Sequence, residues 1–160
     1  MTLTTNPPWF SAAASARTFL VAAAQTWEDT QASEQYIQQA LAQPDIDLDV
    51  LVSAYRYYFY KNNNVMALEM ATTVCDRIQT AEQWPADWDD LKPILLARLE
   101  DEIARLYLSA YAASGLLLAR LGKVEAAQAI ADQIQQIEAK EFGAELLHNI
   151  LNPPPEEEDD

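Results

Sequence analysis

The sequence has few of the residues that interrupt helices or that build covalent and metal sites. Its 160 residues include 3 glycines, one cysteine (Cys75) and one histidine (His148). A single cysteine excludes an internal disulfide and a cysteine-based metal cluster. Alanine, leucine, glutamine and glutamate, which favour helices, are abundant, and β-branched residues do not alternate with polar ones over the length of a strand. These features predict an all-α protein.

Positive charge is also scarce. The chain carries 10 basic and 25 acidic residues, which gives a formal net charge of −15. The basic residues are scattered, and residues 18–55 contain six acids and no basic residue. A chain this acidic repels a phosphate backbone and an anionic lipid surface. Nucleic acid and membranes are therefore not expected as partners.

Long apolar runs are absent as well. The run at residues 19–24 is far shorter than the roughly 18 residues that a membrane helix needs, and the N-terminus lacks a basic signal-peptide region. The cytoplasm is the expected location. A chain of this length fits one domain, which we expect over residues 1–152. Three prolines and five acids make up residues 153–160, and this tail is too polar to pack, so we expect it to be disordered.

Apolar residues recur at steps of three and four along most of the chain, which is the period of an amphipathic helix. Seven helices are expected, at about residues 8–24, 28–42, 49–61, 65–80, 91–121, 124–139 and 141–151. The fifth is long, because one apolar stripe runs through it without interruption. Asp89 or Asp90 is expected to cap its start, and Arg98 and Glu102 are expected to pair along its outer side.

The hairpin at residues 111–134 carries the most specific pattern in the chain. A large residue, a small residue, an aliphatic residue, a turn glycine and two alanines follow one another at Tyr111, Gly115, Leu118, Gly122, Ala127 and Ala131. This spacing resembles that of tetratricopeptide repeats. A partial second match lies 60 residues upstream at Leu51, Tyr55, Tyr58, Asn62, Ala67 and Ala71. The resemblance implies stacked antiparallel helical hairpins; a generic antiparallel bundle is the alternative.

Residues 53–61, SAYRYYFYK, form the most unusual segment. Four tyrosines and a phenylalanine occupy six consecutive positions with one arginine, and one helix cannot bury all of these rings. Most of them either fill gaps between hairpins or line a binding surface, which suits the apolar ring and polar tip of tyrosine. In the tetratricopeptide family, the binding face is lined by residues of the first helix of each hairpin. That resemblance implies partner-binding roles for Arg56, Phe59, Tyr60 and Arg120, in which an arginine could hold a carboxylate through two hydrogen bonds.

The sequence predicts neither an enzyme nor a metal or cofactor site. Glu145 and His148 have the Glu-x-x-His spacing of di-iron bundles, but the second motif that such a site needs is missing. Asp87, Asp89 and Asp90 lack the pattern of a calcium loop. Cys75 falls at an apolar helical spacing, which predicts a buried thiol.

The expected function is that of a protein-interaction adaptor that binds a peptide or a helix of a partner. One alternative is a small acidic chaperone for secreted proteins, since tetratricopeptide-containing chaperones of similar size and charge exist. Another is a structural homodimer that buries Trp84, Trp88 or the tyrosine-rich helix.

Overall fold

The computed structural model describes residues 8–44 and 46–137, and these residues form an all-α structure without strands. The seven helices are α1 (Pro8–Gln25), α2 (Thr30–Leu41), α3 (Leu48–Tyr60), α4 (Asn64–Glu82), α5 (Trp88–Ala97), α6 (Glu102–Arg120) and α7 (Val124–Gln135). The predicted fold class is confirmed. The predicted helix at 141–151, the tail at 153–160 and the Glu145–His148 pair lie outside the described residues.

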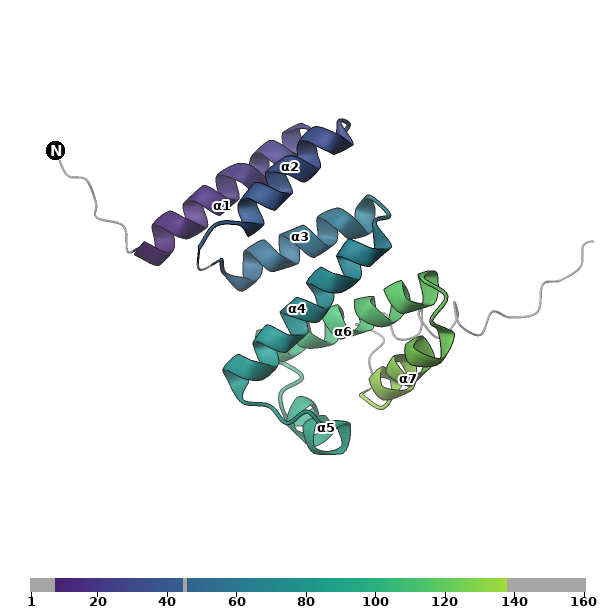
Figure 1. Cartoon of the computed structure of the whole chain (residues 1–160). Helices are drawn as coiled ribbons and strands as arrows, with labels where there is room; N and C mark the ends of the chain where they lie inside the picture. Colours follow the sequence, from purple (N-terminus) through teal and green to yellow (C-terminus); the bar gives the residue numbers. More distant parts are fainter. Residues whose placement is uncertain (1–7, 45, 138–160) are drawn as a thin grey trace, which may run out of the picture. The chain divides into compact units, whose positions relative to one another are not determined.

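Contacts divide the chain into two compact units, with the boundary inside α3, after Tyr57. In the first unit, α1 and α2 form an antiparallel hairpin (Figure 1). Its core contains Ala16 of α1, Ala40 of α2 and Val50 of α3, and larger apolar side chains pack around them: Phe19, Leu20, Leu41 and Ile46. The small residues let the helices approach closely while the larger ones exclude water.

Local capping explains where the helices of the first unit begin. The Asp29 carboxylate accepts a hydrogen bond from the Ala32 amide of α2 at 3.1 Å. Asp47 accepts one from the Val50 amide of α3, also at 3.1 Å. Each carboxylate satisfies an amide that has no partner within its own helix.

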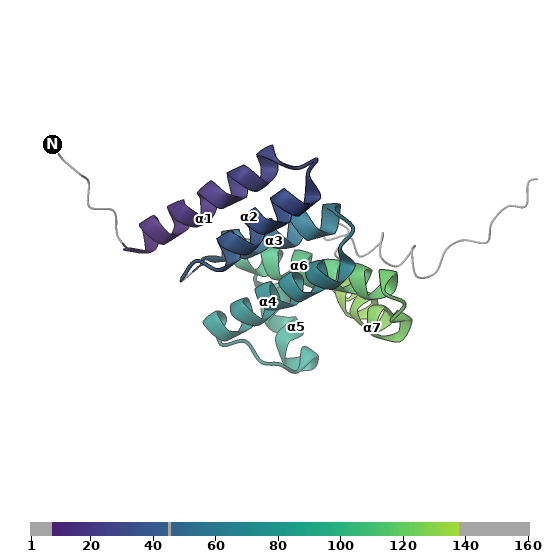
Figure 2. The ribbon, with the colours of Figure 1, turned by 45° about the horizontal axis from the view of Figure 1, so that its top comes forward.

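In the second unit, α6 packs against both α4 and α7 and therefore forms its centre (Figures 1 and 2). Leu108 and Leu117 of α6, Val74 of α4 and Ile134 of α7 are fully buried. Alanines that are also fully buried line the first turns of the other two helices: Ala67 and Ala71 of α4, and Ala127 and Ala131 of α7. Small side chains at four-residue spacing allow close packing of helices.

The predicted long helix at 91–121 is wrong, because α5 ends at Ala97 and a separate helix, α6, begins at Glu102. Asp101 is the N-cap of α6. Its carboxylate accepts hydrogen bonds from the amides of Ile103 at 2.7 Å and Ala104 at 3.4 Å, which stabilises the start of a new helix. Arg98 therefore does not share a helix with Glu102. It donates instead to Asp101 and, at 3.1 Å, to Glu82 at the end of α4.

The start of α5 also differs from the prediction. Asp87, rather than Asp89 or Asp90, is the N-cap, and its carboxylate accepts from the Asp89 amide at 3.1 Å. The helix thus begins at Trp88, three residues earlier than expected, so that Pro93 lies inside it, beyond its first turn. The aspartates at 89 and 90 occupy the first turn, where the helix dipole favours negative charge.

Candidate functional site

The tyrosine-rich helix α3 buries most of its rings. Tyr55, Tyr57 and Tyr58 are at most 9% exposed, whereas Tyr60 is 69% exposed. Within the first unit, the Tyr57 hydroxyl shares a hydrogen bond with Ser33 of α2, and Trp27 meets its ring edge-on at a centroid distance of 5.5 Å. Three of the four tyrosines are thus packed in the interior, and Tyr60 is the one that is exposed to solvent.

Three of the four sequence-predicted site residues come together at one end of the second unit. The Arg120 guanidinium lies over the Phe59 ring, with its central carbon 4.6 Å from the ring centroid. Tyr60 meets Phe59 edge-on, at 5.7 Å between centroids and 84° between planes. The half-buried Phe59 therefore contacts both Arg120 and the exposed Tyr60. Together the three side chains form a cation–π and aromatic cluster at the ends of α3 and α6.

The fourth predicted residue, Arg56, lies on α3 in the first unit and is exposed. It precedes Tyr60 by four residues on a continuous helix, a spacing that places two side chains on the same helix face.

The two helix ends that carry these residues close with the same backbone geometry. Asn62 and Gly122 both adopt a left-handed conformation, with φ of 60° and 81°. After α3, the amides of Asn62 and Asn63 donate to the carbonyls of Phe59 and Tyr58; after α6, those of Gly122 and Lys123 donate to Ala119 and Leu118. This paired pattern is a Schellman motif. Tyr60 and Arg120 each lie two residues before the left-handed residue.

The sequence interpretation missed the residues that follow these turns. Lys123, the N-cap of α7, is exposed. Val65 and Val124, at the starts of α4 and α7, are 62% and 55% exposed. Their places close to Asn62 and Gly122 were a signal in the sequence, because Val65 follows its turn residue by three positions and Val124 follows its own by two. We call Phe59, Tyr60, Arg120 and Lys123 the turn patch.

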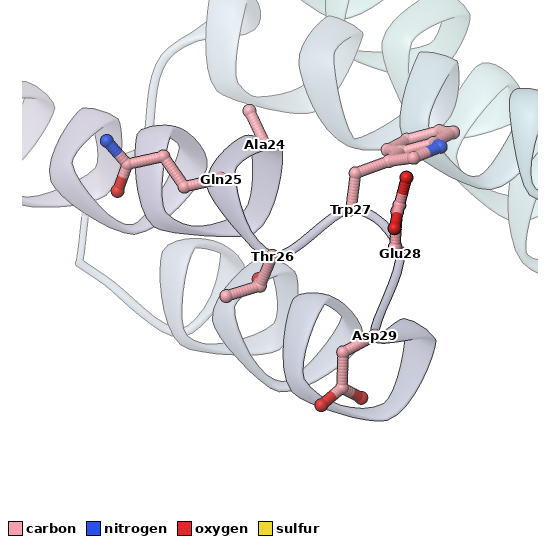
Figure 3. A pocket seen from close by; sticks show the side chains of 6 residues that line it. All are labelled: Ala24, Gln25, Thr26, Trp27, Glu28 and Asp29. Atoms are coloured by element: carbon pink, nitrogen blue, oxygen red, sulfur yellow. The ribbon is translucent and has the colours of Figure 1, made fainter.

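A separate hollow of about 510 Å³ lies in the first unit, at the turn between α1 and α2. Figure 3 shows its lining, residues 24–29. Much of the lining serves the local fold. The Thr26 hydroxyl donates to the Ala22 carbonyl at 2.8 Å, the Asp29 carboxylate caps α2, and Trp27 packs on Tyr57. This hollow is therefore a weaker candidate than the turn patch.

The aromatic residues around the α4–α5 connection pack among themselves. Trp84 is 8% exposed, meets Tyr107 edge-on at 5.5 Å and is covered by Arg98 at 5.2 Å. Trp88 stacks on Tyr111 and donates through its indole nitrogen to Gln136 at 3.1 Å. Trp84 is thus a core residue, and it offers no surface to a second copy of the chain.

Cys75 has the properties of a structural thiol. It is 6% exposed, which confirms the predicted burial. Loss of hydration, with a smaller contribution from the Asp76 charge, raises its pKa to about 12. The reactive thiolate is therefore negligible at neutral pH. Within residues 8–44 and 46–137, no cluster of three potential metal ligands occurs, and no helix there is long and apolar enough to cross a membrane.

Comparisons with known proteins found a distant relative of the chain. It is similar to an uncharacterized 19.8 kDa protein in the nifW 5′ region of Azotobacter chroococcum mcd 1, with 29% identity over 132 residues, which cover 75% of this chain and 74% of the relative. No protein-family model and no solved structure matches the chain.

Proposed function

We propose that the protein is a non-enzymatic, cytoplasmic adaptor that binds a peptide or a helix of a partner protein through Arg56, Phe59, Tyr60 and Arg120. The observation that carries this proposal is the exposed ring of Tyr60 beside the Phe59–Arg120 contact. Tyrosine and arginine are enriched among the residues that dominate binding energy at protein interfaces. A ring that stays at 69% exposure has apolar area left for a partner to cover.

The tetratricopeptide-like arrangement is part of the same proposal. Two Schellman turns 60 residues apart, each followed by two fully buried alanines, support a repeated hairpin. In such a repeat, Tyr60 and Arg120 occupy equivalent positions.

The test is capture of a partner from the native host with the double variant Arg56→Ala/Tyr60→Ala. Alanine favours helix, so α3 should keep its circular dichroism signal while capture is lost. A matched control exists on α1, where Arg17 and Val21 are likewise an exposed arginine and an exposed apolar residue four positions apart. Arg17→Ala/Val21→Ala should capture the partner as well as the original protein does. Equal capture by both double variants would refute the site.

The two alternatives make different predictions. A chaperone for secreted proteins should be encoded beside secretion genes and should bind an unfolded secreted protein. The similar Azotobacter protein is named for its position beside nifW. If the gene of this chain also lies beside nifW, the products of neighbouring genes are the first partners to test. A structural homodimer should instead show twice the chain mass in sedimentation and should lose that mass in Tyr60→Ala.

A further inference from the structure

Negative charge is excluded from two segments of the chain. Residues 50–68 and 103–124 contain no acid at all, although the chain has 25, and they contain five of its ten basic residues. These five are Arg56, Lys61, Arg105, Arg120 and Lys123. The two segments therefore carry +5 and the remainder carries −20, which together give the net charge of −15. These five basic residues are thus separated from acids along the sequence, whereas the other five lie in the acid-containing remainder.

The fold brings the ends of these two segments together. Phe59 and Tyr60 end α3 in the first segment, Arg120 and Lys123 flank the α6–α7 turn in the second, and the Phe59–Arg120 contact joins them at 4.6 Å. Exposed apolar side chains gather at the same two turns: Tyr60, Val65 and Val124 are all more than half exposed. The turn patch is therefore a basic and partly apolar surface on a strongly acidic protein.

Building on the proposed adaptor function, we infer that the turn patch binds an acidic segment of a partner protein in which carboxylates alternate with aromatic or aliphatic side chains. Charge complementarity selects this class, because an acidic segment is attracted to this surface and repelled by the rest of the chain. Tyr60 of the turn patch, together with Val65 and Val124 that follow the two turns, supplies apolar area for the partner's apolar side chains. A nucleic acid is disfavoured, because its uniform phosphate charge would meet the −20 of the surrounding chain.

Arg120 is positioned in advance for this role. Its contact with the Phe59 ring restricts the guanidinium before a partner arrives, which lowers the entropy lost on binding. A cation–π contact is not a hydrogen bond, so the N–H donors remain for a carboxylate, which arginine can hold through two parallel bonds. Lys123 adds a second charge from the same turn without a fixed geometry.

The test uses a fluorescein-labelled synthetic peptide of glutamates alternating with phenylalanine and leucine, titrated with the full-length protein and followed by anisotropy. Arg120→Gln/Lys123→Gln should weaken binding at least about tenfold, a loss equivalent to one charge-assisted hydrogen bond. Arg17→Gln/Lys92→Gln removes the same charge elsewhere and should change affinity less than about twofold, since remote exposed charges are screened. Arg120→Lys should recover only part of the affinity, because lysine cannot bind a carboxylate through two parallel bonds.

Several results would overturn this inference. Equal weakening by both double variants would make the attraction a matter of net charge alone. Tight binding of a peptide with glutamines in place of glutamates, or of a single-stranded oligonucleotide, would assign the patch to another ligand. A gain of more than about threefold when the acids of residues 156–160 become amides would assign the patch to the chain's own tail.

Capture of the native partner and binding of the acidic peptide test the two proposals separately. If Arg56→Ala/Tyr60→Ala loses the native partner while the acidic peptide does not bind, the adaptor proposal stands and the acidic-segment inference falls. If the peptide depends on Arg120 and Lys123 but the native partner is captured unchanged by the Arg56 and Tyr60 variant, the site proposed for the adaptor falls instead.

Discussion

Substitution of Gly122 tests whether the α6–α7 turn is held by its left-handed backbone. Its φ is 81°, and a Cβ added there would meet no atom within 4 Å, so alanine would introduce no clash. The cost of Gly122→Ala is then backbone strain alone, about 1–2 kcal/mol for a left-handed residue with a Cβ. Alanine also lowers the conformational entropy of the unfolded chain, which stabilises the folded state by about 0.4–1 kcal/mol. We expect a net loss of about 1 kcal/mol in the free energy of unfolding.

The equivalent turn supplies the comparison. Asn62 already holds φ of 60°, because asparagine tolerates this region better than other residues with a Cβ. Gly122→Asn should therefore cost clearly less than Gly122→Ala, and Asn62→Gly should stay within about 0.5 kcal/mol of the original protein. Asn62→Ala should repeat the loss seen with Gly122→Ala.

Urea unfolding followed by circular dichroism measures these differences as shifts in the midpoint at constant slope. In a thermal scan, a loss of 1 kcal/mol lowers the melting temperature by about 2–4 °C for a chain of about this size. The reasoning is refuted if Gly122→Ala is as stable as the original protein, or if Gly122→Asn costs as much as Gly122→Ala. Either result would mean that the left-handed conformation is not what the turn requires.

Three further predictions concern the second unit. Hydrogen bonds from Arg98, and then from the Ile103 amide, lower the pKa of Asp101; its stabilisation is therefore complete above about pH 4, the carboxyl's value in the unfolded chain, and is lost as the pH falls through the lower folded value. Asp101→Ala should lower the melting temperature at neutral pH and lose this acid dependence, while an unchanged profile would contradict the cap. The Cys75 thiol should react with Ellman's reagent only after denaturation, because burial raises its pKa to about 12; rapid labelling of native protein would contradict its burial. Leu117→Ala, at a fully buried position, should cost about 2–5 kcal/mol, whereas Leu96→Ala, at 42% exposure, should cost much less in the same urea titration.

Local signals in the sequence predicted the fold class and most helix ends. The aspartates before α2 and α3 accept hydrogen bonds from amides three residues later, and the amides of the asparagines after α3 donate to carbonyls three and five residues earlier. These effects are local and therefore readable from the sequence. The break before α6 was not predicted, because the apolar stripe continues through it with helical period. The helix is interrupted because Asp101 caps a new one. Asp101 is itself held by Arg98, which also binds Glu82, 16 residues before Arg98 in the sequence, and this contact is not readable from local spacing.

The candidate site was predictable in part. The tetratricopeptide-like spacing selected Phe59, Tyr60 and Arg120 from two positions 60 residues apart, and the structure joins Phe59 to Arg120. The burial of Tyr55, Tyr57 and Tyr58 was not readable from composition, because burial depends on what each face of α3 packs against. The segregated charge was present in the sequence but became meaningful only once the fold brought the two acid-free segments together.

The most direct test of the account is photo-crosslinking in the native host from a benzophenone amino acid placed at position 60, compared with the same group at position 21. Both positions are more than half exposed in the structure, so the two probes have comparable access to solvent. The account predicts a discrete adduct of higher mass from position 60 and none from position 21, and it predicts that Arg120→Gln/Lys123→Gln weakens the adduct. No adduct from position 60, or equal adducts from both positions, would contradict the claim that the turn patch is an interaction surface.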